Sequence, residues 1–410
     1  MTTTLDGKHV VLGVTGSIAC FKAADLASKL VQHRAVVDVI LTAEATRFVT
    51  PLTFQALTHR PVITDLFDPQ AEIAMDHVAL ALRADLIVIC PATAHTIARL
   101  SLGLADDALT TTVLACKAPL VIVPAMDAHM FHHVTVQEHT QRLQARGAQI
   151  LGPVEGRLAS GLVGKGRMIE VGEIVDHLRL VLGRTTGDLR GRTVIVTAGG
   201  TQEPLDPVRV ITNRSSGKMG YAIAEAARDR GARTVLVTAP TSLTDPAGVE
   251  VIAVRTAAEM REAVLRIVPR ADALIMAAAV ADYRPAKVEA QKVKKGRATW
   301  ALEMTRTSDI LAEVDGSLVK VGFAAETEDL VENARKKLAD KHLHLIVAND
   351  VSHPDGVFGA DESRVVLIDR SGTAEELPLL PKTEVARRIL NRVADLLTRS
   401  RAAGSPTPPA

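Results

Sequence analysis

Residues 193–220, TVIVTAGGTQEPLDPVRVITNRSSGKMG, decide the fold of the second half of this chain. The β-branched run from Thr193 to Thr197 predicts a buried strand. The pair Gly199-Gly200 lets the backbone turn tightly and approach a ligand. A polar loop, residues 213–218, then leads into a predicted helix from Met219 to Arg230. A strand, a glycine turn and a helix N-terminus favour an anion site, because free N–H groups and the helix dipole act at one place.

Two cations in this loop, Arg214 and Lys218, favour a phosphorylated ligand. The alternative is an ordinary strand–helix turn with a solvated loop. A Walker A loop is excluded, because it needs glycine and serine or threonine where the chain has Thr212 and Met219. The dinucleotide pattern GxGxxG is absent from the sequence as well, which argues against an NAD-type oxidoreductase.

The bulk composition describes a globular, enzyme-like chain. Its 410 residues suggest two or three domains, and 47% hydrophobic content with a net charge of +1 argues against nucleic-acid binding. The sequence contains no apolar run long enough for a membrane span and no export signal at its start. Cys20, Cys90 and Cys116 lie in apolar runs without metal-ligand spacing. We therefore expect buried free thiols and a cytoplasmic location.

Short apolar strands alternate with helices in the first half. The strands are expected at residues 10–14, 36–41, 86–90 and 120–123. This alternation predicts a doubly wound parallel sheet. Ligands bind beyond the carboxyl ends of such strands, so the four loops that follow them should converge on one crevice.

The second half repeats this pattern after a predicted helix over 171–182 and a linker over 183–190. We expect an N-terminal domain over 1–182, a C-terminal domain over 191–400 and a disordered tail over 401–410. The glycine-rich segment 152–168 predicts a lid or a long loop without secondary structure.

A predicted helix over 329–341 carries an apolar stripe of Leu330, Ala334 and Leu338. Lys337 and Lys341 lie at the edge of this stripe. They either extend along the surface or reach into a cleft.

Long motifs then resemble a known family over nearly the whole chain. In the first half these are GVTGSIA (13–19), PATAHTIARL (91–100), LADDALTTT (104–112) and PAM (124–126). In the second half they are residues 197–220, AAVADYRP (278–285), KVKK (292–295), VGFAAETE (321–328) and AND (348–350). The chain resembles the bifunctional coenzyme A biosynthesis proteins, in which phosphopantothenoylcysteine decarboxylase is fused to phosphopantothenate–cysteine ligase. The resemblance implies a flavodoxin-like, FMN-binding domain and a Rossmann-like, CTP-dependent ligase domain.

For the ligase, the resemblance implies that CTP with Mg²⁺ activates the carboxylate of 4′-phosphopantothenate, and that the amine of cysteine then displaces CMP. Asn213 would hold the acyl group, Arg209 would belong to the pantothenate site, and Lys292 would sit at the reacting phosphate. The other residues implied for CTP and substrate are Gly199, Gly200, Ala278, Asp282, Thr307, Ser308, Asp309, Ile310, Phe323, Lys337 and Lys341. No protein side chain is assigned to the metal.

For the decarboxylase, the resemblance implies catalytic roles for His77, Asp127 and Ser160. The FMN-binding positions are Gly16, Ser17, Ile18, Thr42, Pro91, Ala92, Thr93, Ala94 and Met126. Asp127 stands where the family has Asn, and Ser160 stands where it has the flap Cys. An ionised Asp127 would repel the substrate carboxylate unless its pKa is raised or it faces a donor. A serine hydroxyl is a far weaker proton source than a thiol.

Two alternatives stay open at this point. The N-terminal half could bind FMN and assemble the oligomer without catalysis, or it could be a flavin prenyltransferase-like domain beside an unrelated Rossmann domain. The resemblance also implies a homo-oligomer, with decarboxylase trimers and ligase dimers, and small-molecule substrates only.

Overall fold

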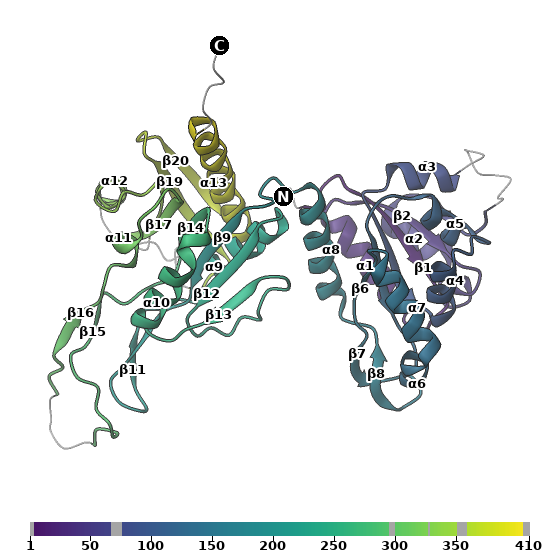
Figure 1. The fold of residues 1–410 in the computed structure, drawn as a ribbon, viewed down its shortest axis with the longest axis horizontal. Coiled ribbons are helices and arrows are strands. Elements are labelled where there is room, and N and C mark those ends of the chain that lie inside the picture. Colours follow the sequence, from purple (N-terminus) through teal and green to yellow (C-terminus); the bar gives the residue numbers. More distant parts are fainter. Residues whose placement is uncertain (1–3, 67–75, 295–299, 327–328, 351–358, 405–410) are drawn as a thin grey trace, which may run out of the picture. The chain divides into compact units, whose positions relative to one another are not determined.

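The chain forms two compact units, residues 1–182 and 183–410. The computed structural model describes residues 4–66, 76–294, 300–326, 329–350 and 359–404 (Figure 1). Lys295, residues 327–328 and residues 405–410, which belong to predicted motifs and to the predicted tail, lie outside these ranges.

The first unit contains a parallel sheet in the order β3-β2-β1-β4-β5-β6. Without the two-residue edge strand β3, this order is the flavodoxin-like order 2-1-3-4-5, so the predicted doubly wound sheet is confirmed. The strands are β1 (His9–Val14), β2 (Val36–Leu41), β3 (Val62–Ile63), β4 (Leu86–Ala92), β5 (Leu120–Pro124) and β6 (Gln149–Ile150).

Helices cover both faces of this sheet, because its strands are apolar on both sides (Figure 1). One core joins the sheet to α1, α2 and α8, and the other joins it to α3, α4, α5 and α7. The helices are α1 (Cys20–Gln32), η1 (Ala45–Arg47), α2 (Pro51–Thr58), α3 (Asp76–Arg83), α4 (Ala94–Leu102), α5 (Ala108–Ala115), α6 (Ala128–His132), α7 (Val134–Ala145) and α8 (Val171–Thr186).

The structure corrects two expectations for this region: that residues 152–168 lack secondary structure, and that the helix beginning at 171 ends at 182. The glycine-rich segment is an antiparallel hairpin of β7 (Val154–Arg157) and β8 (Val163–Arg167), because its glycines permit close backbone packing instead of preventing pairing. The helix α8 runs to Thr186, into the predicted linker, and Gly187 N–H continues its last turn by donating to Gly183 O at 2.8 Å.

The second unit contains an eight-stranded sheet in the order β13-β12-β9-β14-β17-β18-β19-β20. The first six strands are parallel in the dinucleotide-binding order, and β19 and β20 extend the sheet antiparallel. The strands are β9 (Thr193–Ala198), β12 (Arg233–Thr238), β13 (Glu250–Ala253), β14 (Ala273–Met276), β17 (Val319–Glu326), β18 (Leu345–Asp350), β19 (Glu362–Asp369) and β20 (Ala374–Pro381).

Here too each face of the sheet has its own core. The helices α9 and α13 pack on one face, and α10, α11 and α12 pack on the other. The helices are α9 (Lys218–Asp229), α10 (Ala257–Ile267), η2 (Val268–Arg270), α11 (Ile310–Glu313), α12 (Leu330–Asp340) and α13 (Lys382–Gly404). Two small hairpins stand apart from the sheet: β10 (Gln202–Pro204) with β11 (Val210–Thr212), and β15 (Tyr283–Pro285) with β16 (Met304–Arg306).

Helix α13 continues through residues 401–404, which were predicted to be disordered. Ala334 and Leu338 are buried on α12, as the predicted stripe requires. Cys20 and Cys90 are buried and Cys116 is half-buried, all as free thiols. No helix within the described ranges is both long and apolar enough to cross a membrane.

Candidate active sites

In the first unit, a buried threonine joins the ends of the two central strands. Thr15 follows β1, and its hydroxyl donates to Pro91 O at 2.7 Å and accepts from Thr93 N–H at 3.0 Å. The side chain is about 1% exposed. This pair of bonds holds the loop after β4 against the loop after β1, at the point where the strand order reverses and ligands bind in such sheets.

These two hydrogen bonds of Thr15 form a clamp between the loops. Gly16 lies beside this clamp, at a point where a side chain would not fit. A Cβ on Gly16 would approach the Cβ of Glu44, in the loop after β2, to 2.4 Å. The loops carrying Ser17 and Thr42 therefore meet with backbone close to backbone. We call this meeting point the Gly16 cradle, because a strand–glycine–helix turn of this kind suits a phosphate.

A cavity of about 450 Å³ opens next to this cradle. Three of the predicted FMN-binding residues, Ser17, Ile18 and Met126, lie in its wall. The predicted catalytic residues Asp127 and Ser160 lie there too. The remaining lining residues are Ala19, Phe21, Lys22, Ala125, Arg157, Leu158, Ala159, Gly166, Arg167 and Met168. Apolar side chains with a few cations suit a flat, anionic ligand such as FMN.

The hairpin β7–β8 forms one side of this cavity. Met126 N–H donates to Gly166 O at 3.1 Å. Added Cβ atoms on Gly164 and Gly166 would approach the Cβ of Ala128 to 2.8 Å and Met126 O to 2.3 Å. These glycines let the hairpin dock directly on the segment that follows β5.

At the tip of the hairpin, Asp127 and Ser160, for which the resemblance implies catalytic roles, contact each other. The hydroxyl of Ser160 donates to Oδ2 of Asp127 at 2.7 Å, and His129 N–H donates to Oδ1 at 3.0 Å. These donors, Ser160 first, lower the pKa of Asp127. Asp127 therefore stays ionised. It would nevertheless not repel the substrate carboxylate strongly, because its own carboxylate faces hydrogen-bond donors.

Within the part of the chain that the structure describes, the other residues predicted for this site are not among those that line the cavity. Thr42 follows β2, where its hydroxyl accepts from Ala45 N–H at 3.3 Å. Pro91 and Ala92 belong to β4, and Ala94 begins α4. His77 lies on α3, which packs against α5. It is not among the described residues that line the cavity.

The second unit also joins the loops of its site through the hydroxyls of buried threonines. Thr197, in β9, accepts from Ala278 N–H at 3.1 Å, and Thr201 accepts from Ala281 N–H at 2.9 Å. Both threonines are fully buried. Buried threonines therefore hold the loop after β14 against the loop after β9, where the strand order reverses again.

The N-terminus of α9 opens onto this crevice. Gly217 begins the helix at φ +76°, a left-handed conformation that favours glycine. At Gly220, a Cβ would approach the Cβ of Ala198 to 2.5 Å, so this glycine brings the helix close to β9. Gly217 and Gly220 thus set the direction of α9 and its close approach to β9.

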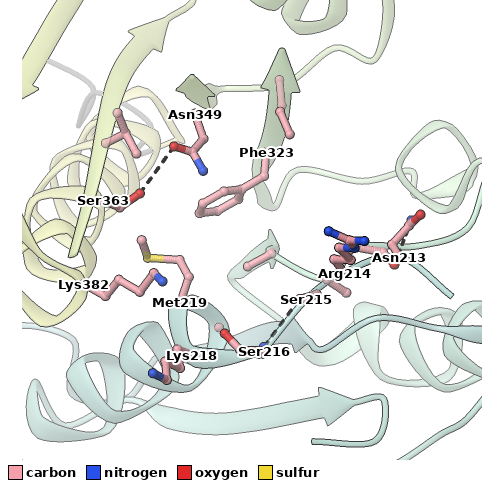
Figure 2. A pocket seen from close by; sticks show the side chains of 18 of the residues that line it. Asn213, Arg214, Ser215, Ser216, Lys218, Met219, Phe323, Asn349, Ser363 and Lys382 are labelled. Atoms are coloured by element: carbon pink, nitrogen blue, oxygen red, sulfur yellow. Dashed lines mark hydrogen bonds between the residues drawn. The ribbon is translucent and has the colours of Figure 1, made fainter. Parts of the chain in front are cut away.

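A cavity of about 550 Å³ lies in front of this helix (Figure 2). The predicted residues Asn213, Ala278, Asp282, Phe323 and Lys337 line it together, although they come from separate segments of the sequence. The other lining residues are Arg214, Ser215, Ser216, Gly217, Lys218, Met219, Gly220, Ala277, Ala279, Val280, Ala324, Ala325, Asn349, Gly359, Glu362, Ser363, Val365 and Lys382.

Figure 2 shows Phe323 pointing from strand β17 toward the cavity, and Asn213 and Arg214 lying in the loop across from Lys382. The Nδ2 atom of Asn213 donates to Ala279 O at 3.3 Å and to Val280 O at 3.2 Å. Cations outnumber acids in this wall, which suits an anionic ligand.

Two lysines at one end of this cavity hold the segment before β19. Lys218 Nζ donates to Gly359 O at 2.8 Å and to Asp361 Oδ1 at 2.7 Å, and Lys382 Nζ donates to Ala360 O. Burial and the charge of Lys218 lower the pKa of Lys382. Lys382 was missed from the sequence because it stands at the start of an ordinary amphipathic helix.

Several predicted residues lie outside this wall. Lys341 pairs with Asp309 at 2.9 Å, and Thr307 is tied to the loop after β14 through Ala281 O at 2.6 Å. Ser308 lies next to Thr307 in the wall of a separate cavity, and Ile310 is buried.

Gly199, Gly200, Arg209 and Lys292 are also outside the wall. A Cβ on Gly200 would approach Asn213 O to 2.7 Å, so the glycine pair shapes the backbone behind the cavity. Lys292 is exposed on the loop after β15. Arg209 pairs with Asp206 in the turn before β11.

The threonine clamps were also missed, although a sequence signal exists. In both halves a threonine closes an apolar strand just before a glycine, as Val14-Thr15-Gly16 and Val196-Thr197-Ala198-Gly199. Among the described residues, no group of three His, Cys, Asp or Glu side chains converges as a metal site would.

Comparison with known proteins follows the division into two units. A family model described as Flavoprotein matches residues 1–183, and one described as DNA/pantothenate metabolism flavoprotein C-terminal domain matches residues 189–397. The Coenzyme A biosynthesis bifunctional protein CoaBC of Bacillus subtilis is 47% identical over 96% of this chain and 98% of its own length. Its counterpart from Escherichia coli K12 is 43% identical over 95% and 97%. A crystal structure of the C-terminal domain of a CoaBC protein covers 52% of this chain and 100% of its own, with 41% identity and a TM-score of 0.46.

Proposed function

The chain belongs to the family of bifunctional coenzyme A biosynthesis proteins, and from this premise we propose that its two units catalyse two consecutive steps. The second unit joins 4′-phosphopantothenate to cysteine in a CTP-dependent reaction. The first unit, with FMN, decarboxylates the product to 4′-phosphopantetheine.

The observation that carries the ligase assignment is the convergence of Asn213, Asp282, Phe323 and Lys337 on one cavity. In the proposed reaction, the carboxylate of 4′-phosphopantothenate attacks the α-phosphate of CTP, and pyrophosphate leaves. The amine of cysteine then attacks the acyl carbon, and CMP leaves. The first step brings two anions together, the carboxylate and the triphosphate, so the surplus of cations around the cavity would lower its barrier by offsetting their charge.

Individual roles follow from position. Asn213 directs its amide toward the loop after β14 and would orient the acyl group there. Lys337 would contact the triphosphate, and Phe323 would cover the base or ribose. We assign Mg²⁺ to the nucleotide's phosphates, since CTP brings oxygen ligands of its own.

For the first unit, the cradle at Gly16 and the apolar wall around Met126 fit FMN. When bound, FMN would supply the redox chemistry that makes loss of carbon dioxide possible. This chain's own residues would hold it: Ser17 and Ile18 at the phosphate, and Met126 at the ring. Ser160 and Asp127 would close the hairpin over the bound substrate.

A homo-oligomer is part of the proposal. Large hydrophobic side chains are exposed mainly on the first unit, among them Phe21 (64%), Leu52 (70%) and Leu82 (81%). Such surface favours association between copies. Sedimentation of the purified protein measures this state. We also propose a cytoplasmic location, which suits the three free thiols.

The test is a product assay with 4′-phosphopantothenate, cysteine, CTP and Mg²⁺, read by mass spectrometry. We expect 4′-phosphopantetheine, and an Asn213→Ala variant should abolish it while retaining bound flavin. Supplying phosphopantothenoylcysteine directly separates the second step from the first. Accumulation of phosphopantothenoylcysteine would instead mean that the first unit only binds flavin. Absence of any product would refute the ligase, and supplied phosphopantothenoylcysteine that stays unchanged would refute the decarboxylase.

A further inference from the structure

Asp206 is a buried carboxylate outside both cavities. Its side chain is 0% exposed. Oδ1 accepts from Val208 N–H at 2.9 Å and from Arg209 N–H at 2.8 Å. Oδ2 accepts from Arg209 Nε at 3.0 Å, from Arg209 Nη2 at 2.5 Å and from Val293 N–H at 3.2 Å. These donors, Arg209 first, lower the pKa of Asp206, so it is an anion throughout the working pH range.

Arg209 is held from the other side by the lysine-rich segment. Its Nη2 donates to Val293 O at 3.1 Å, and its guanidinium lies 4.9 Å from the ring centre of Trp300. Donation of two N–H groups to one carboxylate oxygen and stacking on an aromatic ring both depend on the planar guanidinium, which lysine lacks.

The consequence concerns Lys292, the neighbour of Val293. Both backbone polar groups of Val293 are bonded to the Asp206–Arg209 pair. A few residues upstream, Glu289 N–H donates to Leu205 O at 3.0 Å. The exposed segment that carries Lys292 is therefore hydrogen-bonded to the 205–209 turn both before the lysine, at Glu289, and after it, at Val293.

We infer that Asp206 and Arg209 form a clasp with Val293 and Trp300, and that this clasp positions Lys292 for the ligase reaction. The inference rests on the proposed ligase function and on the role at the reacting phosphate that the resemblance implies for Lys292. Arg209 acts here as a positioning residue, with its charge already engaged by Asp206. This differs from the expectation that Arg209 binds pantothenate directly. A direct ligand would change KM, whereas a positioning residue changes kcat, because misplacement of a reacting group by about 1 Å costs on the order of 100-fold.

The chain has a single tryptophan, so its fluorescence reports on the clasp directly. We would compare Arg209→Lys and Asp206→Asn with Arg270→Lys, a matched control at the exposed end of η2. In both clasp variants, acrylamide should quench Trp300 more strongly, and kcat for ligation should fall about 10- to 100-fold with KM for 4′-phosphopantothenate within about 2-fold. The control should match the wild type in both measurements.

A Lys292→Ala background provides the second arm. Adding Arg209→Lys to it should lower the rate no further, since the clasp acts through Lys292. Independent losses would overturn the inference, as would a raised KM with unchanged kcat in Arg209→Lys. If Asp206→Asn does not fold by circular dichroism, Arg209→Lys carries the test. If the wild-type chain makes neither phosphopantothenoylcysteine nor 4′-phosphopantetheine, the ligase proposal fails, and unchanged quenching in Arg209→Lys would separately overturn the clasp.

Discussion

Replacing Thr15 by valine removes a hydroxyl and keeps the shape of the side chain. In the folded protein this hydroxyl donates to Pro91 O at 2.7 Å and accepts from Thr93 N–H at 3.0 Å, and the residue is buried. Each lost hydrogen bond costs about 1 kcal/mol, and a buried polar group left unsatisfied costs about 1–3 kcal/mol. Thr93 is partly accessible to water, so we expect a loss of about 2–4 kcal/mol in the free energy of unfolding of the first unit.

This loss has two measurable consequences. For a unit of this size, about 1 kcal/mol lowers Tm by roughly 2–4 °C, so Thr15→Val should lower the Tm of the first transition by roughly 5–15 °C. The clamp also positions the start of α4 beside the proposed flavin site. FMN affinity should therefore fall by about tenfold or more, since a tenfold change corresponds to only about 1.4 kcal/mol.

The control is Thr15→Ser in the full-length protein, measured by calorimetry and flavin titration. Serine keeps the hydroxyl and loses one buried methyl group, at a cost of about 1 kcal/mol. If the hydroxyl clamp matters, serine is better tolerated than valine. If burial of apolar surface dominates, valine is better tolerated. A valine variant as stable as the serine variant, with unchanged FMN affinity, would refute the clamp.

Three further predictions concern other parts of the chain. Gly16→Ala should lower FMN affinity by about tenfold or more in a flavin titration, because its Cβ would meet Glu44 at 2.4 Å; retained affinity would show that the cradle does not depend on this contact. The pKa of Asp127 is lowered from 3.8, so its bond to Ser160 persists above that pH and is lost only as the pH falls through the lowered pKa. Protection of the backbone amides at 158–162 against hydrogen exchange, relative to the intrinsic rate at each pH, should therefore stay constant from pH 8 to about 5 and fall in Asp127→Ala; unchanged protection in that variant would contradict a role for the Asp127–Ser160 bond. Burial lowers the pKa of His344 from 6.5 to about 4, so the folded protein binds fewer protons than the unfolded chain and loses stability as the pH falls through this window. The full shift corresponds to about 3 kcal/mol, reduced to roughly 1–2 kcal/mol for a half-exposed ring; urea unfolding of His344→Gln should lack this dependence, and an equal slope would contradict it.

The threonine clamps show that both units solve one packing problem in the same way. In a doubly wound sheet, the loops after the first and fourth strands must lie side by side to form the ligand crevice. Thr15 and Thr197 satisfy backbone N–H groups there with buried hydroxyls. Threonine suits this position because its β-branch favours the strand that it ends.

Much of the architecture follows from patterns along the chain. The alternation of apolar strands and amphipathic helices predicted two doubly wound sheets, and the stripe on residues 330–338 predicted the buried face of α12. These features depend on neighbouring residues, whose side-chain period matches the period of a helix or a strand. The hairpin β7–β8 escaped prediction because its strands are rich in glycine, and the contacts that require these glycines are made with Met126 and Ala128, far back in the chain.

The chemistry of the sites follows from distances between segments remote in sequence. From the sequence, Asp127 was a carboxylate of uncertain effect and Arg209 a substrate contact. In the folded chain, Asp127 meets the Ser160 hydroxyl, and Arg209 joins Asp206 to Val293. Local periodicity specifies which faces are buried and hence which elements form. The partner of a given polar side chain depends on where the loops meet after packing, and hydrogen bonds at 2.5–3.2 Å tolerate almost no error in that placement.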